Sequence, residues 1–169
     1  MSNYVIIVAG GKGLRMGSDI PKQFLPVGNK PVLMRTISRF HEYDKSINII
    51  LVLPKEQQAY WKELCDKYHF DEEYTLTDGG DTRFQSSKNG LMIIPDGEEG
   101  LVGIHDGVRP FVSISTIARC YDTAEDTYAA IPVMPVTDTL RYIDKQGGGK
   151  NVLRSDYRVV QTPQVFDIA

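Results

Sequence analysis

The sequence predicts an α/β protein with a doubly wound, mostly parallel sheet, and two observations support this fold class. Short apolar strand patterns alternate with amphipathic helix patterns along most of the 169 residues. That order is typical of parallel sheets with helices on their faces. A glycine-rich turn with cations directly follows the first strand pattern, at the edge where such sheets bind ligands. The length suits a single domain, residues 1–169, with a substantial core.

The first half of the chain gives two strand–helix pairs. Residues 4–9 form a β-branched, nearly uncharged run, as in a strand covered on both faces. Residues 31–43 begin with proline and carry apolar side chains at helical spacing, which predicts a helix. A second buried strand is expected at 47–53, and an amphipathic helix at 55–68.

The second half continues the alternation with shorter elements. We expect a strand at 74–77, a turn at 78–81, a helix at 82–93, a strand at 101–105, a helix at 113–127 and a strand at 129–133. The polar and glycine-rich motifs fall at the carboxyl ends of these strands, so we expect the ligand site there.

Residues 138–156 break this pattern. Two short strand-like stretches, 139–144 and 150–154, are joined by Gln-Gly-Gly-Gly at 146–149, which predicts a hairpin. An isolated hairpin is marginally stable in water and needs a surface to pack on. The hairpin is therefore either an arm that packs on another surface or an ordinary solvated hairpin of a monomer.

The turn after the first strand has the composition of a phosphate-binding loop. Its glycines let bare N–H groups approach an anion, and its cations add positive charge. These residues are Gly10, Gly11 and Gly13, with Lys12, Arg15 and Lys22. The dinucleotide fingerprint G-x-G-x-x-G does not fit, because the third glycine comes one position late. The P-loop pattern G-x-x-x-x-G-K-[ST] does not occur in the chain.

Four motifs in this order resemble the cytidylyltransferase family of the nucleotidyltransferases. They are A-G-G-K-G-L-R-M at 9–16, P-K-Q at 21–23, H-D-G-V-R-P at 105–110 and Q-T-P-Q at 161–164. Together they resemble the members that make 4-diphosphocytidyl-2-C-methyl-D-erythritol in the non-mevalonate pathway of isoprenoid synthesis. Ribitol-5-phosphate cytidylyltransferases are close relatives. The resemblance implies a Rossmann-like nucleotidyltransferase fold, with CTP and a polyol phosphate as substrates.

The resemblance also assigns roles to individual residues. Arg15 and Lys22 match the two catalytic cations, which suits a reaction that accumulates negative charge on phosphates. The matching nucleotide-binding residues are Ala9, Gly10, Gly11, Gly13, Gly80, Asp81, Ser86 and Gly107. Gly107 matches a ribose contact where many relatives have alanine. Gly80 and Asp81 could equally form only a turn and a helix cap.

Asp106 is the candidate Mg²⁺ ligand. It follows an apolar strand, and a hard cation prefers such carboxylate oxygens. The alternative is a turn or cap made by an aspartate before glycine. Arg109 matches a family arginine near the same site and could orient Asp106. Arg83 is expected to be a structural partner of acidic neighbours.

The second substrate is matched by residues at the two sides of the hairpin. Thr139 and Arg154 match the family's polyol-phosphate ligands, and Asp138 could bind polyol hydroxyls. In the family this arm clasps a second subunit and completes its active site, so the resemblance implies a homodimer. Thr162 lies where the family also approaches the active site.

The resemblance has one departure, at Ala169. Family members continue beyond this position and carry an aspartate and a lysine there, so those two roles are assigned to no residue of this sequence. Two alternatives stay open: the chain is a truncated or partly recorded form, or its site is incomplete. A noncatalytic nucleotide-binding module fits the second alternative. A sugar-1-phosphate nucleotidyltransferase shares the glycine loop but not the motifs at 105–110 and 161–164.

Composition and net charge exclude some classes of binding partner. The net charge of −3 argues against a nucleic-acid surface, and the local cations fit a small anion instead. We expect no membrane span and no signal peptide. Cys65 and Cys120 are expected to be reduced structural thiols of a cytoplasmic protein, rather than redox or zinc residues.

Overall fold

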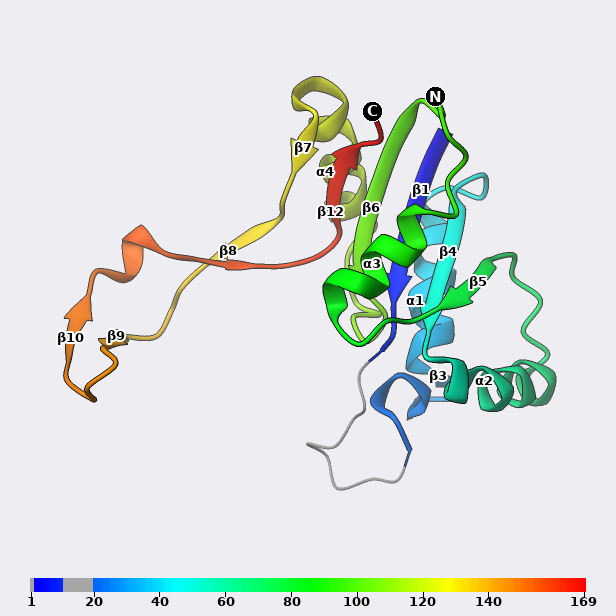
Figure 1. Cartoon of the computed structure of the whole chain (residues 1–169), viewed down its shortest axis with the longest axis horizontal. Coiled ribbons are helices and arrows are strands. Elements are labelled where there is room, and N and C mark those ends of the chain that lie inside the picture. The colour runs from blue at the N-terminus through cyan, green and yellow to red at the C-terminus, as the bar shows by residue number, and fades with distance from the viewer. Residues whose placement is uncertain (1, 11–19) are drawn as a thin grey trace.

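The computed structural model describes residues 2–10 and 20–169, and its centre is a six-stranded sheet (Figure 1). In spatial order the strands are β5 (Thr75–Asp78), β4 (Asn48–Leu53), β1 (Ser2–Val8), β6 (Gly100–Asp106), β12 (Gln164–Asp167) and β7 (Ala129–Ala130). The first four run parallel to one another, so their carboxyl ends meet at one edge. The predicted α/β class with a mostly parallel sheet is confirmed.

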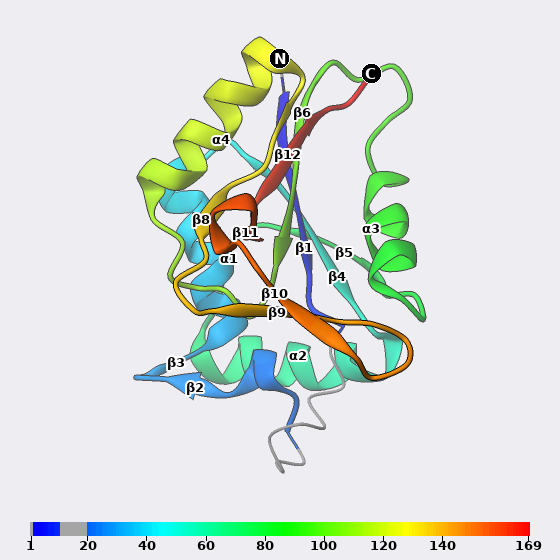
Figure 2. The ribbon, with the colours of Figure 1, turned by 90° about the vertical axis from the view of Figure 1, so that its left-hand side faces the viewer.

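Helices cover both faces of the sheet. The helices α1 (Val32–Tyr43), α2 (Lys55–Tyr68) and α4 (Ile114–Thr127) pack on one face, and α3 (Arg83–Leu91) packs on the other (Figure 2). Successive side chains of a strand point to opposite faces. Val5 and Ile7 accordingly join the cluster under α1, whereas Ile6 joins the second cluster and contacts the position of Gly90 in α3. The central strand β1 is therefore apolar on both sides, as its sequence predicts.

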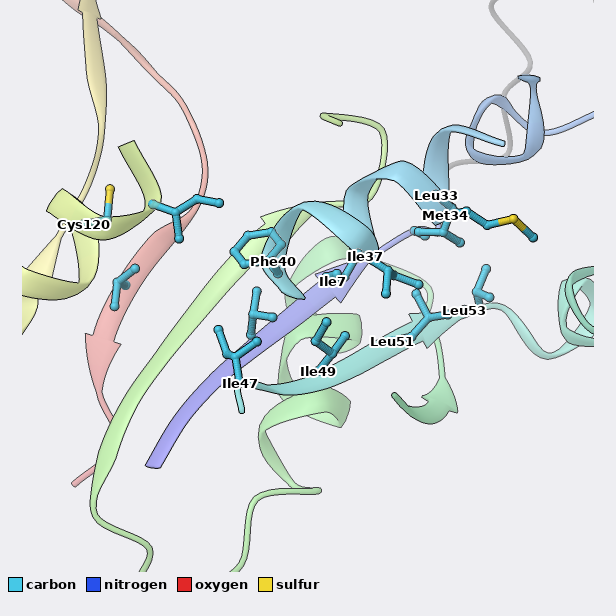
Figure 3. Close-up of a cluster of buried hydrophobic side chains, with 14 of the residues drawn as sticks. Ile7, Leu33, Met34, Ile37, Phe40, Ile47, Ile49, Leu51, Leu53 and Cys120 are labelled. Atoms are coloured by element: carbon cyan, nitrogen blue, oxygen red, sulfur yellow. The ribbon is translucent and has the colours of Figure 1, made fainter. Parts of the chain in front are cut away.

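The larger of the two cores lies between α1 and the sheet. Figure 3 shows Leu33, Met34, Ile37 and Phe40 of α1 over Ile7, Ile49 and Leu51 of β1 and β4. Full burial of each such side chain stabilises the fold by about 1.5–3 kcal/mol. Cys120 of α4 belongs to the same cluster, and both Cys120 and Cys65 are free thiols. Burial raises the pKa of both thiols, which suits the structural role expected of them.

Capping residues set where two of the predicted helices begin. The prediction for 55–68 matches α2 in full, but α3 and α4 each begin one residue later than predicted. Thr82 and Ser113 are their N-caps: the Thr82 hydroxyl accepts the N–H of Gln85 at 3.1 Å, and the Ser113 hydroxyl that of Thr116 at 3.1 Å. These side chains satisfy N–H groups that the first helical turn leaves without partners.

The predicted strand at 129–133 is wrong as a single element. It divides into β7, which joins the central sheet, and β8 (Val133–Pro135), which pairs with β11 (Arg158–Val160) outside it. Pro132 separates the two, and a proline cannot donate to a sheet ladder. The strand β12 is a further difference: it runs antiparallel to β6 and β7, so this side of the sheet is mixed.

The hairpin is present, at the tip of an arm that reaches away from the sheet (Figure 1). Its strands are β9 (Leu140–Ile143) and β10 (Gly149–Val152), and η3 (Arg154–Asp156) follows them. The β8–β11 pair forms the base, so the extended segment is longer than the predicted 138–156. Thr139 directly precedes β9 and Arg154 begins η3, so neither residue lies in the hairpin strands.

The segment from residue 20 leads into α1 by short elements. These are the 3-10 turn η2 (Lys22–Phe24) and the ribbon of β2 (Pro26–Val27) and β3 (Lys30–Pro31). Phe24 of η2 is buried against Trp61 and Tyr60 of α2, with ring centroids 6.2 and 5.3 Å apart. Among the described residues, no helix has the length and apolar character to cross a membrane.

Candidate active site

Three of the parallel strands bring the candidate nucleotide-binding residues together at their carboxyl edge. Val8 of β1 pairs in register with Asp106 of β6, so Ala9 lies beside Gly107. A Cβ on Gly10 would lie 3.8 Å from the Ser86 hydroxyl of α3. That hydroxyl in turn accepts the Gly80 N–H at 3.0 Å, after β5. We call the group of Ala9, Gly10, Gly80, Ser86 and Gly107 the cradle.

Several predictions from the sequence fall on residues 11–19. Gly11, Gly13 and Arg15 lie outside the described residues, as does Lys12. Lys22 is described, in η2 and half-buried. Asp81 is exposed beside the cradle, and its N–H donates to the Gln85 side chain at 3.1 Å. The cap expected at 80–81 is made by the next residue, Thr82, and the cradle role of Gly80 and Asp81 stays a prediction.

Gly107 allows the two strand ends to approach closely. A Cβ at this position would lie 2.9 Å from the Cβ of Ala9 and 3.1 Å from Leu33. The Gly107 N–H donates to the carbonyl of Val8 at 2.9 Å, and its own carbonyl accepts the Thr36 hydroxyl of α1 at 2.8 Å. An alanine here requires Ala9 to shift, so this close approach depends on glycine.

Asp106 lies between two guanidinium groups at the end of β6. Its Oδ1 accepts from Arg83 Nη2 at 3.2 Å, and its Oδ2 accepts from Arg109 Nε at 2.9 Å. The expectations for both arginines are met: Arg83 pairs with an acidic neighbour, and Arg109 orients Asp106. Arg109 also donates to the side chain of Gln161 at 2.5 Å. These partly exposed pairs hold the carboxylate in a fixed orientation on the α3 side of the sheet.

His105 is buried behind this carboxylate, on the α1 side of the same strand. Its ring lies edge-on to Phe40, with centroids 4.9 Å apart. Its Nε2 lies 3.0 Å from the carbonyl of Arg109, and its Nδ1 lies 3.0 Å from the hydroxyl of Thr162. Burial lowers the pKa of His105 to about 4, so the ring is neutral near pH 7.

Gln23 fixes the turn that carries Lys22, a function that the sequence prediction missed. Its side-chain amide is buried and donates to the carbonyl of Ala9 at 2.9 Å and to Gln57 of α2 at 2.6 Å. The backbone of Lys22 is thereby held to the end of β1. The signal in the sequence was the presence of Gln23 in the P-K-Q motif, but its partners are distant along the chain.

The donor set at Asp106 suits a magnesium ion held partly by substrate. Among the residues described, no group of three or more His, Cys, Asp or Glu side chains could form a protein cage for a metal. Mg²⁺ often takes one or two carboxylates, several waters and substrate phosphates instead. The single carboxylate of Asp106 beside the cradle fits that mode, in competition with Arg83 and Arg109.

The candidate residues for the second substrate lie on the arm, apart from the cradle. Asp138, Thr139 and Arg154 are all exposed, and Arg154 donates a short hydrogen bond to the carbonyl of Thr137. Within residues 2–10 and 20–169, no hydrogen bond or ion pair joins these three to the cradle or to Asp106. The structure of one chain therefore does not bring the two groups of residues together.

A groove lies at the root of the arm, between α4 and the turn after β6. It has a volume of about 960 Å³ and is lined by Arg109, Phe111, Ala130, Met134 and Thr162, among other residues. Phe111 and Met134 are well exposed. This groove adjoins the Asp106 turn through Arg109 and Thr162.

Known proteins match this chain over nearly its whole length. The family model of 2-C-methyl-D-erythritol 4-phosphate cytidylyltransferase matches residues 3–169. The curated enzyme of that name from Phocaeicola vulgatus is 61% identical over 168 residues, which cover 99% of this chain and 75% of the relative. The chain thus spans about three quarters of the length of that relative.

Solved structures agree with the sequence matches. The 4-diphosphocytidyl-2C-methyl-D-erythritol synthase of Anaerococcus prevotii has a TM-score of 0.81 at 30% identity, covering 99% of this chain and 70% of that one. The 2-C-methyl-D-erythritol 4-phosphate cytidylyltransferase of Thermus thermophilus has a TM-score of 0.71 at 31% identity, covering 98% and 70%. The sheet, helices and arm described above are therefore an arrangement that these structures share.

We predict that Gln23→Met lowers the free energy of unfolding by about 1–3 kcal/mol, because it leaves the buried Ala9 carbonyl without this donor. Urea unfolding measures the change. Gln146→Met, at an exposed position in the hairpin turn, is the matched control and should cost well under 1 kcal/mol. Equal losses in the two variants would show that Gln23 does not anchor the turn.

Proposed function

The chain belongs to the 2-C-methyl-D-erythritol 4-phosphate cytidylyltransferase family, and we propose from this how its residues perform the family's reaction. The enzyme transfers a cytidylyl group from CTP to 2-C-methyl-D-erythritol 4-phosphate, in isoprenoid synthesis. The products are 4-diphosphocytidyl-2-C-methyl-D-erythritol and pyrophosphate. The whole-chain family match carries this conclusion, and it favours methylerythritol phosphate over ribitol 5-phosphate as the acceptor.

The reaction sets what the site must supply. A phosphate oxygen of the acceptor attacks the α-phosphorus of CTP, and the bond from that phosphorus to the pyrophosphate oxygen breaks. Negative charge grows on the α-phosphate oxygens and on the departing pyrophosphate. Fixed positive charge aimed at these atoms lowers the barrier most, because it is arranged before the reaction starts.

We assign the cationic role to Arg15 and Lys22. Support for Lys22 comes from its place on η2, which Gln23 ties to the end of β1 beside the cradle. Support for Arg15 comes from its match to the family motif. A guanidinium offers paired donors to phosphate oxygens, and a lysine offers a compact charge.

We assign the nucleotide to the cradle. The backbone of Gly10, with Gly11 and Gly13, would receive phosphates, and Ala9, Gly80, Asp81 and Ser86 would receive the cytosine. Gly107 would lie against the ribose. This arrangement is supported by the small side chains at the carboxyl edge, since a ligand can approach the backbone closely there.

We assign the magnesium ion to Asp106, with further ligands from the CTP phosphates and water. The ion would neutralise charge on the triphosphate and orient it for attack. Arg109 and Arg83 keep the carboxylate oriented in its absence, which is supported by their two ion pairs. The alternative role of the Asp106 side chain as a turn or helix cap is weakened, because its oxygens bind arginines rather than backbone N–H groups.

We further propose a homodimer in which the arm completes the partner's site. Thr139 and Arg154 would hold the acceptor phosphate, with Asp138 on the polyol hydroxyls. Support comes from the separation of these residues from the cradle and from the apolar side chains that the arm exposes. At least 46% of the surface is exposed for each of Val133, Met134, Tyr142, Ile143, Leu153, Tyr157, Val159 and Val160. A second copy could cover this surface.

The two free thiols fit a cytoplasmic location.

The decisive experiment is a pyrophosphate-release assay on the purified chain with CTP, Mg²⁺ and 2-C-methyl-D-erythritol 4-phosphate. We expect a product with the mass of 4-diphosphocytidyl-2-C-methyl-D-erythritol. Ribitol 5-phosphate is the matched alternative acceptor. Faster turnover of ribitol 5-phosphate would contradict the proposed acceptor, and CTP binding without turnover of either would contradict catalysis by this chain.

For the cations, we predict that Lys22→Ala and Arg15→Ala each lower kcat by roughly a hundredfold or more while changing KM for CTP far less. The reason is that each removes charge used mainly in the transition state. Lys55→Ala, at an exposed position on α2, is the control and should retain wild-type kcat. A kcat within about threefold of wild type in either variant would remove that residue from the catalytic role.

For the metal, we predict that Asp106→Asn raises the magnesium concentration needed for half-maximal activity, because an amide is a poorer ligand for a hard cation. Arg83→Gln should not raise it, since this change removes a competitor for the same carboxylate. Asp66→Asn, on the exposed side of α2, controls for the loss of one charge. An unchanged midpoint in Asp106→Asn would leave Asp106 only the role of holding Arg83 and Arg109.

For the dimer, we predict that mixing Arg15→Ala protein with Arg154→Ala protein restores part of the activity. In a heterodimer, one of the two sites has both arginines intact if the arm serves the partner. Random exchange places half the subunits in heterodimers, so recovery should approach about a quarter of wild type. Subunit exchange without recovery would show that Arg154 acts within its own subunit or does not bind substrate.

A further inference from the structure

His105 is a buried residue that the proposed reaction does not use, yet it lies directly behind the Asp106–Arg109 turn. We propose that His105 is a positioning residue: it ties this turn to Thr162 and thereby couples the root of the arm to the nucleotide site. The inference rests on the proposed function, because His105 would act in that reaction only by positioning the turn that carries Asp106.

The hydrogen bonds around His105 are consistent with only one tautomer of the neutral ring. The carbonyl of Arg109 can only accept, so Nε2 of the neutral ring carries the proton and donates to it at 3.0 Å. Nδ1 is then an acceptor and receives the Thr162 hydroxyl at 3.0 Å. The Thr162 oxygen in turn accepts the backbone N–H of Asp106 at 3.3 Å. The ring thus bonds the Arg109 end of the turn directly and the Asp106 end through Thr162. In this tautomer Nε2 is always the donor and Nδ1 always the acceptor.

Consecutive side chains of β6 face opposite sides of the sheet and have different roles. His105 points toward α1, where Phe40 packs against it, and Asp106 points toward α3, where Arg83 pairs with it. Thr36 adds a bond from α1 to the carbonyl of Gly107. The turn is therefore held from behind by a buried, uncharged network and presents Asp106 and Arg109 on the other side.

The network continues into the arm. Thr162 comes two residues after β11, one of the two strands at the base of the arm. Its neighbour Gln161 donates its N–H to the carbonyl of Pro132, on the outgoing side of the arm, at 2.9 Å, and accepts from Arg109 at 2.5 Å. The return side of the arm's root is therefore bonded directly to the turn that carries Asp106, and the outgoing side is bonded to the return side at Pro132. A displacement of the arm is transmitted to this turn through Thr162, His105 and Gln161.

Substitutions at His105 can separate the two ring nitrogens. His105→Phe removes both hydrogen bonds and keeps a ring of similar shape. The amide of Gln can take the place of Nε2, and the amide of Asn that of Nδ1, so His105→Gln and His105→Asn each retain one bond. His41→Gln is the matched control, because His41 is away from the cradle and bonds the carbonyl of Glu73.

We expect His105→Phe to lower kcat by about tenfold or more with KM for CTP within about twofold, since small misplacements of catalytic groups act mainly on the chemical step. His105→Gln and His105→Asn should each recover part of the lost kcat. Combining His105→Phe with Thr162→Val should cost no more than the larger single change, because the two residues act as one unit. Additive losses, or kcat within about twofold of wild type in His105→Phe, would overturn the proposal.

A direct measurement checks the network independently of turnover. In the imidazole nitrogen spectrum of the wild-type protein, His105 should show a protonated Nε2 and an unprotonated Nδ1, and Thr162→Val should shift the Nδ1 resonance. The opposite tautomer would overturn the proposal even if His105→Phe fails to fold. Wild-type protein without pyrophosphate release would contradict the proposed function, whereas active wild type with unaffected variants would contradict only the role of His105.

Discussion

The register between β1 and β6 is the constraint on which the site depends. Val8 pairs with Asp106, so the first residues after β1 and the turn after β6 meet at one edge of the sheet. The Gly107 N–H closes this contact on the Val8 carbonyl, and Gly107 has no side chain to prevent it. A slip by one residue would turn Asp106 to the α1 face and His105 to the α3 face, since side chains alternate along a strand. Both the carboxylate and its buried support would then be lost.

The single carboxylate at this edge is paired with two guanidinium groups before any substrate binds, so the cluster keeps a net positive charge. Asp106 faces two guanidinium groups, and these pairs are partly exposed, so they contribute modestly to stability. Their value is orientation: each oxygen has one fixed partner, on different elements.

The sequence predicted the alternating elements well because their signals are local. Proline and apolar spacing marked α1 and α2, and Thr82 and Ser113 marked helix starts within one residue. One error passed over a local signal, because Pro132 marks the division of 129–133. The antiparallel placement of β12 depends instead on how the arm returns to the sheet, and no local pattern encodes that path.

The same reason explains which site residues were missed. Gln23 and His105 both stood inside recognised motifs, but their functions are defined by partners far along the chain, such as Gln57 and Thr162. Buried polar side chains need such partners, and a sequence shows only that the side chain is polar.

The residues proposed for the reaction lie on two separate surfaces of one chain: the edge of the sheet and the arm. The cradle and Asp106 are built on the rigid edge of the sheet, where the strands fix them. The candidate phosphate ligands Thr139 and Arg154 are built on an extended segment with no core of its own within the described residues. Such a segment gains order only from what it packs against. If a second copy provides that surface, the acceptor site forms only when the dimer forms, and the bonds from Gln161 and Thr162 to the Asp106 turn connect that assembly to the nucleotide site.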